Sequence, residues 1–352
     1  MALGISLSLT ACQPSAASPP EQAIDASAGR RRCPAETHPI VVHEIDSPQA
    51  WIVLTTADAS ESLPLVGGEH VYGAVWSPDG RSMVFRRRTV TLEGGNAPTE
   101  LVLLDVDGAD EVALFEDSTP YADNLVQRSP DGPTWSPDGR WLAFASQRDA
   151  DHWRIWAISR SGGQLRLLLP DLVEVPHFYP RWSSRAPATL AYGAEVDGRQ
   201  DLFVVDPNAG VIPENLTRGR LARPESPSWS PDGRFIAFSA EELTPTDPEA
   251  PNRDIYTLEV VTRDLVRATY DPNVDAQPAW SPDGRLLLFS SNGARATETD
   301  PLFREWSDLW TLPLDENKRP IDGTLATPLR QTNTRSQNDA DWYGQSNCGG
   351  SP

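Results

Sequence analysis

One hexapeptide recurs through the chain and limits the folds that it can adopt. The sequence Trp-Ser-Pro-Asp-Gly-Arg occurs intact at Trp76–Arg81, Trp135–Arg140, Trp229–Arg234 and Trp280–Arg285. A degenerate copy begins at Trp182, and Trp342 stands where a sixth copy would begin. Neighbouring copies are between 47 and 62 residues apart. A period of about 50 residues is typical of one four-stranded propeller blade with its loops.

Each copy has the chemistry of a tight hairpin turn. Proline fits the second position of a type I turn, and glycine supplies the positive φ that the turn needs at its end. An apolar strand comes next, at 83–85, 142–144, 236–238 and 287–289, and at 190–192 in the degenerate copy. We expect the tryptophan before the turn and the aromatic residue after it to pack between neighbouring blades.

Two further strands are expected in each repeat. The third strand is predicted at 101–104, 154–157, 201–204, 254–257 and 308–311. A fourth, more exposed strand follows, as at 112–115 and 164–167. Four strands per unit with the weakest outermost is the pattern of a propeller blade.

The two ends of the chain complete the ring. Trp342 begins a sixth blade whose missing strands are found near the start, at 40–42, 51–54 and 63–66. Sharing the last blade between both termini removes an open sheet edge. The sequence therefore predicts an all-β, six-bladed propeller over residues 40–345, followed by a tail at 346–352.

The four intact copies resemble the PD40 repeat, or WD40-like β-propeller repeat, of the TolB family, and the resemblance covers about residues 40–345. It implies a periplasmic, non-enzymatic propeller that binds other envelope proteins. The TolB protein of that family also carries a separate N-terminal α/β domain, for which residues 13–39 leave no room. Because a propeller fold hosts many activities, TolB's own role is not carried over.

The start of the chain resembles an export signal. Residues 2–11 are mostly apolar, and Leu9-Thr10-Ala11-Cys12 is similar to the lipobox of bacterial lipoproteins, although no Lys or Arg precedes the apolar run. We expect a signal at 1–12 with lipidation of Cys12, and a flexible tether at 13–39. The alternative is a chance Ala-Cys pair. The expected location is the periplasm or the outer membrane of a Gram-negative bacterium.

Two further cysteines, Cys33 and Cys348, flank the predicted propeller. In an exported protein they can oxidise to a disulfide, and a ring-shaped fold brings its ends together. Such a bridge is worth on the order of 5 kcal/mol in the chain-entropy model. The alternative is a pair of unrelated thiols.

The net charge of the chain limits the classes of partner that it is expected to bind. The formal net charge is −20, and basic residues gather only in short runs such as Arg86-Arg87-Arg88. An acidic surface repels phosphate backbones, so nucleic-acid binding is not expected. The expected partners are envelope proteins or peptides, with the membrane reached only through a lipid anchor.

The candidate binding site is the mouth of the central channel. Residues at the entrances to the predicted innermost strands suit a cation, a basic peptide or a polar ligand, and they are His70, Tyr72, Asp131, His177, Tyr179, Glu225, Asp275, Gln277 and Asp339. The alternative for each is a solvated acidic rim. The long segments 86–100, 117–132, 240–253 and 291–307 are expected on the face opposite the hexapeptide turns, where binding is favoured, and 315–327 on the turn face.

The sequence favours binding over catalysis. It contains no G-x-S-x-G elbow, no H-E-x-x-H motif and no P-loop. We therefore predict no catalytic residue, no metal ligand and no cofactor. The alternative is a metal-dependent or glycan-active enzyme in the channel, similar to propeller-type polysaccharide lyases, for which His70 and His177 are the candidate ligands.

Overall fold

The computed structural model describes the propeller strands and their short turns. The described residues are 40–46, 49–56, 62–68, 71–88, 99–106, 110–116, 131–148, 152–169, 175–185, 187–243, 253–270, 273–292, 308–321, 327–330 and 336–342. Within them, only the backbone is described for 42–46, 49–50, 62, 68, 88, 116, 131, 327–330 and 336–342. The predicted signal, tether, C-terminal tail and all three cysteines lie outside this part of the chain.

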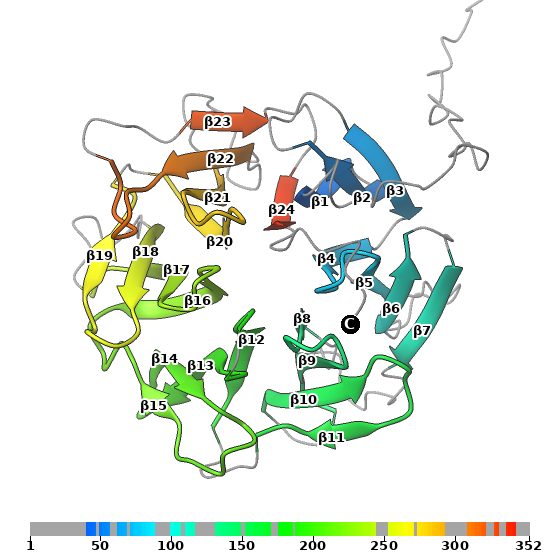
Figure 1. The fold of residues 1–352 in the computed structure, drawn as a ribbon, viewed down its shortest axis with the longest axis horizontal. Helices are drawn as coiled ribbons and strands as arrows, with labels where there is room; N and C mark the ends of the chain where they lie inside the picture. The colour runs from blue at the N-terminus through cyan, green and yellow to red at the C-terminus, as the bar shows by residue number, and fades with distance from the viewer. Residues whose placement is uncertain are drawn as a thin grey trace, which may run out of the picture. The chain divides into compact units, whose positions relative to one another are not determined.

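Twenty-four strands form six four-stranded antiparallel sheets, the blades of a propeller (Figure 1). Blade 1 contains β4 (Val71–Trp76), β5 (Ser82–Arg88), β6 (Thr99–Asp105) and β7 (Asp110–Glu116). Blade 2 contains β8 (Asp131–Trp135), β9 (Trp141–Ser146), β10 (Arg154–Ser159) and β11 (Leu165–Leu167). Blade 3 contains β12 (His177–Trp182), β13 (Leu190–Val196), β14 (Arg199–Val205) and β15 (Glu214–Asn215).

The second half of the ring repeats this order. Blade 4 contains β16 (Ala222–Trp229), β17 (Phe235–Glu241), β18 (Arg253–Glu259) and β19 (Leu265–Arg267). Blade 5 contains β20 (Asp275–Trp280), β21 (Leu286–Ser291), β22 (Asp308–Pro313) and β23 (Thr327–Arg330). Blade 6 contains β24 (Ser336–Trp342), β1 (Ile40–Asp46), β2 (Gln49–Thr55) and β3 (Ser62–Gly68).

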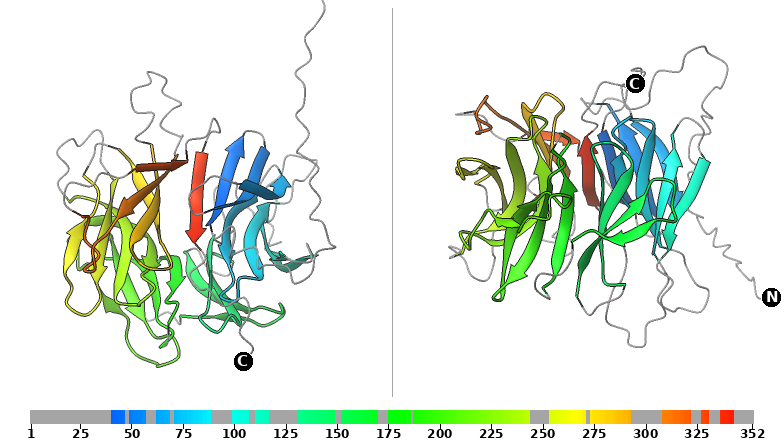
Figure 2. Two further views of the ribbon diagram at one scale, coloured as in Figure 1. Left: turned by 45° about the horizontal axis from the view of Figure 1, so that its top comes forward. Right: turned by 60° about the horizontal axis from the view of Figure 1, so that its bottom comes forward.

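Blade 6 joins the two ends of the described chain. β24 pairs antiparallel with β1, with Ile40 opposite Trp342 and Ile45 opposite Ser336. The two strands lie side by side in every view (Figures 1 and 2). The predicted six-bladed, all-β propeller with a shared last blade is therefore confirmed.

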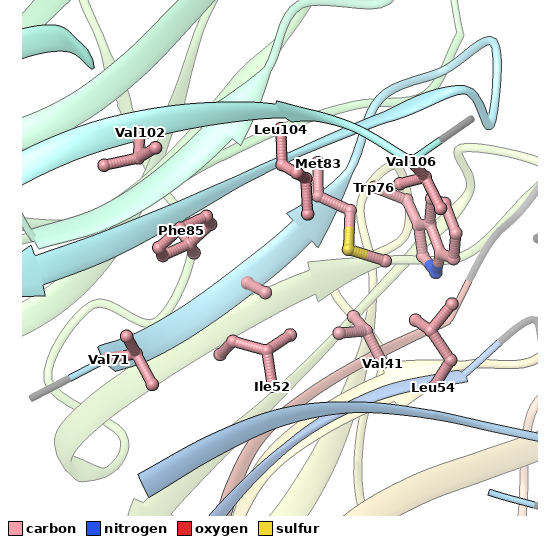
Figure 3. Close-up of a cluster of buried hydrophobic side chains, with 11 residues drawn as sticks. Val41, Ile52, Leu54, Val71, Trp76, Met83, Phe85, Val102, Leu104 and Val106 are labelled. Carbon is pink, nitrogen blue, oxygen red and sulfur yellow. The ribbon is translucent and has the colours of Figure 1, made fainter. Parts of the chain in front are cut away.

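Each hexapeptide tryptophan packs against the blade that precedes it. Trp76 of blade 1 contacts a buried cluster that includes Val41, Ile52 and Leu54 of blade 6 (Figure 3). Trp135 joins Val75 and other residues of blade 1 in the same way. The equivalent residues Trp182, Trp229 and Trp280 lie in clusters shared with blades 2, 3 and 4. The expected packing between blades is therefore confirmed for these five tryptophans.

The indole N–H groups add a directional contact to this packing. Trp229 Nε1 donates to the carbonyl of Arg181 at 3.1 Å, and Trp280 Nε1 donates to the carbonyl of Ser228 at 3.0 Å. In both cases the acceptor is the residue immediately before the tryptophan of the preceding blade. Each such contact fixes the height of one inner strand relative to the next.

The polar residues of the hexapeptide are satisfied within the turn itself. In the first copy, the Ser77 hydroxyl donates to Asp79 Oδ1 at 2.5 Å, and the Arg81 N–H donates to the same oxygen at 3.1 Å. The Ser82 N–H donates to Ser77 Oγ at 3.0 Å. The other three intact copies repeat these bonds. Gly80 has a φ of 66°, as the turn chemistry predicts.

The hydrogen bonds of the turn lower the pKa of its aspartate. Burial by itself would raise the pKa of Asp138. The bonds from the Ser136 hydroxyl and the Arg140 N–H, with the charge of Arg140, outweigh burial and lower this pKa. The pKa values of Asp79, Asp232 and Asp283 are lowered by the same kinds of contact.

Among the described residues there is no helix that is long and apolar enough to cross a membrane.

The lowered aspartate pKa values predict acid sensitivity. A carboxylate whose folded pKa lies below its unfolded value of about 3.9 stabilises the fold above that value and loses this effect as pH falls through the folded pKa. We expect Asp138→Asn to lower the free energy of unfolding at pH 7, and the difference from the parent to shrink as the pH falls below the unfolded pKa of about 3.9. Urea unfolding at several pH values measures this, and an equal difference at pH 7 and pH 3 would contradict it.

The indole contacts predict a difference between two tryptophans. Trp229→Phe removes both packing and a hydrogen bond, whereas the indole N–H of Trp182 has no acceptor among the described residues. We expect Trp229→Phe to lower the free energy of unfolding by about 1 kcal/mol more than Trp182→Phe, the matched control. Equal losses in chemical denaturation would show that packing alone holds the blades together.

Candidate functional site

A ring of backbone irregularities surrounds the central channel. The pairing of the innermost strand with the second strand shifts register at the same place in blades 1 to 5. The residue three positions before the tryptophan has a positive φ, between 49° and 55°, in each of these strands, and these residues are Gly73, Gly132, Tyr179, Ser226 and Gln277. We call these the ring positions. In β24 the pairing with β1 shifts at the corresponding place, which Asp339 occupies.

Three ring positions are filled by residues that disfavour this backbone conformation. A left-handed φ costs an L-residue with a side chain roughly 1–2 kcal/mol, whereas glycine adopts it freely. Blades 1 and 2 use Gly73 and Gly132. Blades 3, 4 and 5 instead hold Tyr179, Ser226 and Gln277 in the same conformation. Strained backbone of this kind collects at binding and catalytic sites, so these side chains are candidates for function.

The ring positions line a cavity of about 250 Å³ at the centre of the propeller. In blades 2 to 5 a proline follows the ring residue and also lines the cavity, at Pro133, Pro180, Pro227 and Pro278. Proline is tolerated in an innermost strand because the edge of that strand that faces the channel has no neighbouring strand. The backbone N–H that proline lacks is therefore not needed for a hydrogen bond between strands. The prolines give the cavity a stiff, largely apolar wall between its polar groups.

Two arginines bring positive charge to this cavity. Arg181 is the residue before Trp182 on β12, and Arg86 lies on β5, where it pairs with Tyr72 of β4. The Arg86 guanidinium lies over the Tyr72 ring at 5.7 Å from its centre. Among the lining residues of the described chain there is no carboxylate. The described lining therefore contains two arginines and no acidic residue, although the whole chain carries a net charge of −20.

The predicted mouth residues divide into three groups. Tyr179 and Gln277 line the cavity, and Tyr72 lies beside it under Arg86. Glu225 and His177 make contacts within the blades, and Asp275 is fully buried. His70 lies outside the described residues, and for Asp131 and Asp339 only the backbone is described.

Glu225 belongs to an ion-pair cluster of blade 4. Its carboxylate contacts Arg253, whose side chain is 11% exposed and which also donates to Glu241 at 3.0 Å. Burial by itself would lower the pKa of Arg253, but the two carboxylates outweigh burial and raise it. Glu225 therefore neutralises the buried cation of Arg253.

His177 is part of the blade 3 core. It is 7% exposed, and its ring meets Tyr192 nearly edge-on with centroids 5.3 Å apart. Burial raises the pKa of the Tyr192 phenol, which keeps that ring neutral beside the histidine. No group of three or more His, Cys, Asp or Glu side chains that could hold a metal ion is found in the described part of the chain.

Sequence reasoning missed Arg86, Arg181 and Ser226. Aligning the inner strands on their tryptophans places Ser226 at the ring position of β16. The same alignment places Arg181 of β12 two residues after the ring position that Tyr179 occupies. Arg86 has no such signal, because it reaches the cavity from the second strand. Four of the predicted long segments lie largely outside the described residues, namely 86–100, 117–132, 240–253 and 291–307. The fifth, 315–327, is described except at 322–326.

Comparisons with known proteins support the fold more strongly than any activity. No family model matches the chain. The uncharacterized peptidase YuxL of Bacillus subtilis is 32% identical over 163 residues, which are 38% of this chain and 24% of that protein. The Tol-Pal system protein TolB of Francisella tularensis is 29% identical over 75 residues, which are 21% of this chain and 16% of that protein. The chain thus spans a quarter or less of either relative.

Solved structures extend the likeness over most of the chain. TolB of Acinetobacter baumannii has a TM-score of 0.63 at 14% identity and covers 86% of this chain and 66% of its own. A TolB-type protein of Agrobacterium tumefaciens has a TM-score of 0.58 at 20% identity and covers 84% and 89%. The propeller is therefore TolB-like in its fold.

The strain at the ring predicts an unusual response to glycine. Ser226→Gly relieves a cost of roughly 1 kcal/mol in the folded state, which the greater freedom of glycine in the unfolded chain offsets in part. We expect the free energy of unfolding to stay unchanged or to rise by up to about 1 kcal/mol. Ser228→Gly, a buried residue of the same strand that is absent from the positive-φ set, is the control and should destabilise the protein. A clear loss of stability in Ser226→Gly would contradict the strain.

Proposed function

We propose that this TolB-like propeller is a cell-envelope protein that binds a protein or peptide partner through its loop-rich face. That face is the one opposite the hexapeptide turns, where the second strand connects to the third and each blade connects to the next. The observation that supports this proposal most is a group of exposed apolar side chains on blade 4. We call Leu243, Tyr270 and Val274 the blade 4 patch.

Three large apolar side chains are exposed in this patch. Leu243 is 52% exposed, Tyr270 is 69% exposed and Val274 is 46% exposed. Leu243 follows the end of β17, and the other two lie between β19 and β20. The antiparallel order of blade 4 brings both of these connections to the loop-rich face.

Each residue of the patch lies next to a charged residue of blade 4 in the sequence or in space. Glu242, which precedes Leu243, accepts a bond from Arg267 Nη1 at 2.6 Å, and the Arg267 guanidinium lies 5.0 Å from the centre of the Tyr270 ring. Val274 forms a backbone bridge with Arg253 at the start of β18. An apolar centre with a charged, hydrogen-bonded surround is the usual anatomy of a protein-binding surface.

The charge of the chain favours a basic partner. At a net charge of −20, long-range attraction accelerates encounter with a basic protein or peptide and repels acidic ones. The proposed envelope location is supported by the lipobox-like sequence that ends at Cys12 and by the TolB relatives. The lipid anchor and the Cys33–Cys348 disulfide remain proposals, because these cysteines lie outside the described residues.

The blade 4 patch predicts which substitutions abolish partner capture. We expect Leu243→Ser combined with Tyr270→Ser to weaken binding at least about tenfold, because central apolar anchors dominate interface energy. The measurement is recovery of crosslinked partners from envelope extracts of the source organism, followed by titration of the purified partner.

The control is a matched pair on the opposite face. Ile212 is 83% exposed and Val261 is 85% exposed, and both lie in connections between third and fourth strands. Ile212→Ser combined with Val261→Ser should leave binding unchanged. Equal recovery with both double variants, or no partner recovered by the parent chain, would overturn the proposed function.

A further inference from the structure

The outer end of blade 3 carries a group of arginines in a chain with a large excess of acidic residues. Arg199 follows the connection between β13 and β14, and Arg218 and Arg220 lie between β15 and β16. Both connections belong to the loop-rich face, and all three residues are exposed. We call these three residues the blade 3 arginines.

Contacts with one short segment bring the three side chains together. Arg218 Nε donates to the first of the three consecutive carbonyls of 215–217 at 3.4 Å. Arg220 donates to the other two carbonyls at 3.0 Å and 3.1 Å. Arg199 Nη1 lies 3.5 Å from the point that a Cβ on Gly219 would occupy. The three guanidinium groups therefore lie around the segment 215–219.

Carbonyl contacts orient these guanidinium groups but do not neutralise their charge. In the part of the chain that the structure describes, none of the blade 3 arginines forms an ion pair. Two carboxylates of blade 3 are used by other groups. Glu214 pairs with Arg263. The buried Asp201 accepts bonds from the Thr217 hydroxyl at 2.5 Å and from the Gly219 N–H at 2.7 Å. Like charges that share no counter-charge repel, so packing alone does not explain the group.

Arg218 also holds its position at a conformational cost. Its φ is 48°, in the left-handed region that glycine adopts freely and other residues avoid. A bond from its N–H to Asn215 Oδ1 at 2.7 Å stabilises this conformation. A charged side chain therefore stands where glycine would fit the backbone without strain.

Arg218 and the blade 4 patch occupy equivalent places on neighbouring blades. In both blades, a threonine after the outermost strand bonds an aspartate and a backbone N–H near the start of the third strand, and these are Thr217 and Thr269. Arg218 follows the first threonine as Tyr270 of the patch follows the second. The blade 3 arginines and the patch therefore belong to the same face, one blade apart.

We propose that the blade 3 arginines bind an acidic segment of a polypeptide, in which several carboxylates are spaced along the chain. The guanidinium groups contact different residues of 215–219, so they present a row of separate charges. A row of charges suits successive Asp or Glu side chains better than one phosphate group, which is bound by donors that converge on a single point.

This inference goes beyond the proposed function, because it assigns a second surface and a different chemistry to the same face. The net charge of −20 favours a partner that is basic overall, through long-range attraction. The blade 3 arginines act at short range and select a short acidic segment within such a partner. Their test uses synthetic peptides and does not require the partner itself.

Paired peptides that differ in charge test the proposal. A fluorescein-labelled ten-residue peptide with four glutamates among glycines and serines is titrated with the full chain and followed by fluorescence anisotropy, beside a peptide with glutamines instead. We expect saturable binding of the glutamate peptide and at least about tenfold weaker binding of the glutamine peptide. Equal binding of the two peptides, or no binding of the glutamate peptide, would overturn the proposal.

Competition separates an acidic polypeptide from other anions. Unlabelled glutamate peptide, inorganic phosphate and phosphatidylglycerol vesicles are compared at equal concentrations of negative charge. We expect the unlabelled peptide to displace the labelled one most effectively. Stronger displacement by phosphate would indicate a phosphate site, and stronger displacement by vesicles would indicate a lipid surface; either result would overturn the proposal.

Arginine variants locate the site. Arg199→Gln and Arg218→Gly should each weaken binding of the glutamate peptide about threefold, and together about tenfold. Arg218→Gly keeps the left-handed backbone without strain, so we expect it to fold. Arg140→Gln is the control, because it removes the same charge from a side chain that is 81% exposed on the turn face, and it should leave binding unchanged. Equal effects of the three single variants would show a non-specific charge effect and would overturn the proposal.

A last variant separates this inference from the proposed function. Leu243→Ser combined with Tyr270→Ser removes the apolar anchors of the blade 4 patch, whereas the glutamate peptide contains no apolar side chain for them to bind. We expect this double variant to bind the glutamate peptide as the parent does. Loss of peptide binding in the folded double variant would place the acidic segment on the patch and would overturn the assignment to the blade 3 arginines.

Discussion

The packing of a tryptophan from each repeat against the preceding blade is the contact on which the propeller depends. An inner strand has only one hydrogen-bonded neighbour in its own sheet, so the blades are joined by side chains. The indole rings fill these junctions, and those of Trp229 and Trp280 also bond a carbonyl of the preceding inner strand. Such contacts set both the spacing and the relative height of successive blades. Closure by β24 then gives blade 6 the same junction with blade 1, through Trp76.

The hexapeptide that builds the ring has little capacity left for ligands. Its serine and aspartate are bonded to each other and to the following backbone, which lowers the aspartate pKa values. The repeated aspartates are therefore structural. Polar groups able to recognise a ligand lie elsewhere, at the ring positions three residues before each tryptophan and on the loop-rich face.

The sequence predicts the fold well because the fold rests on residue identity. Trp, Pro, Asp and Gly recur at fixed offsets, and each has a local physical role that needs no knowledge of the other blades. The cavity is less predictable because its members share a backbone conformation rather than a residue type. Position at the entrance to an innermost strand, together with polarity, predicts Tyr179 and Gln277 correctly. Glu225 and His177 meet the same criteria but are used by an ion pair and a core contact. Arg86 depends on strand register, which a list of strands does not give.

The asymmetry of the ring separates a structural role from a functional one. If the bulge served only to shape the inner strands, glycine would be favoured at every ring position, as in blades 1 and 2. Three consecutive blades instead keep side chains there at a conformational cost, and the three side chains are chemically different. A repeated structural need would produce one residue type around the ring. Strain that the fold itself does not require is typical of functional sites, so these three residues are the strongest candidates for function at the ring positions.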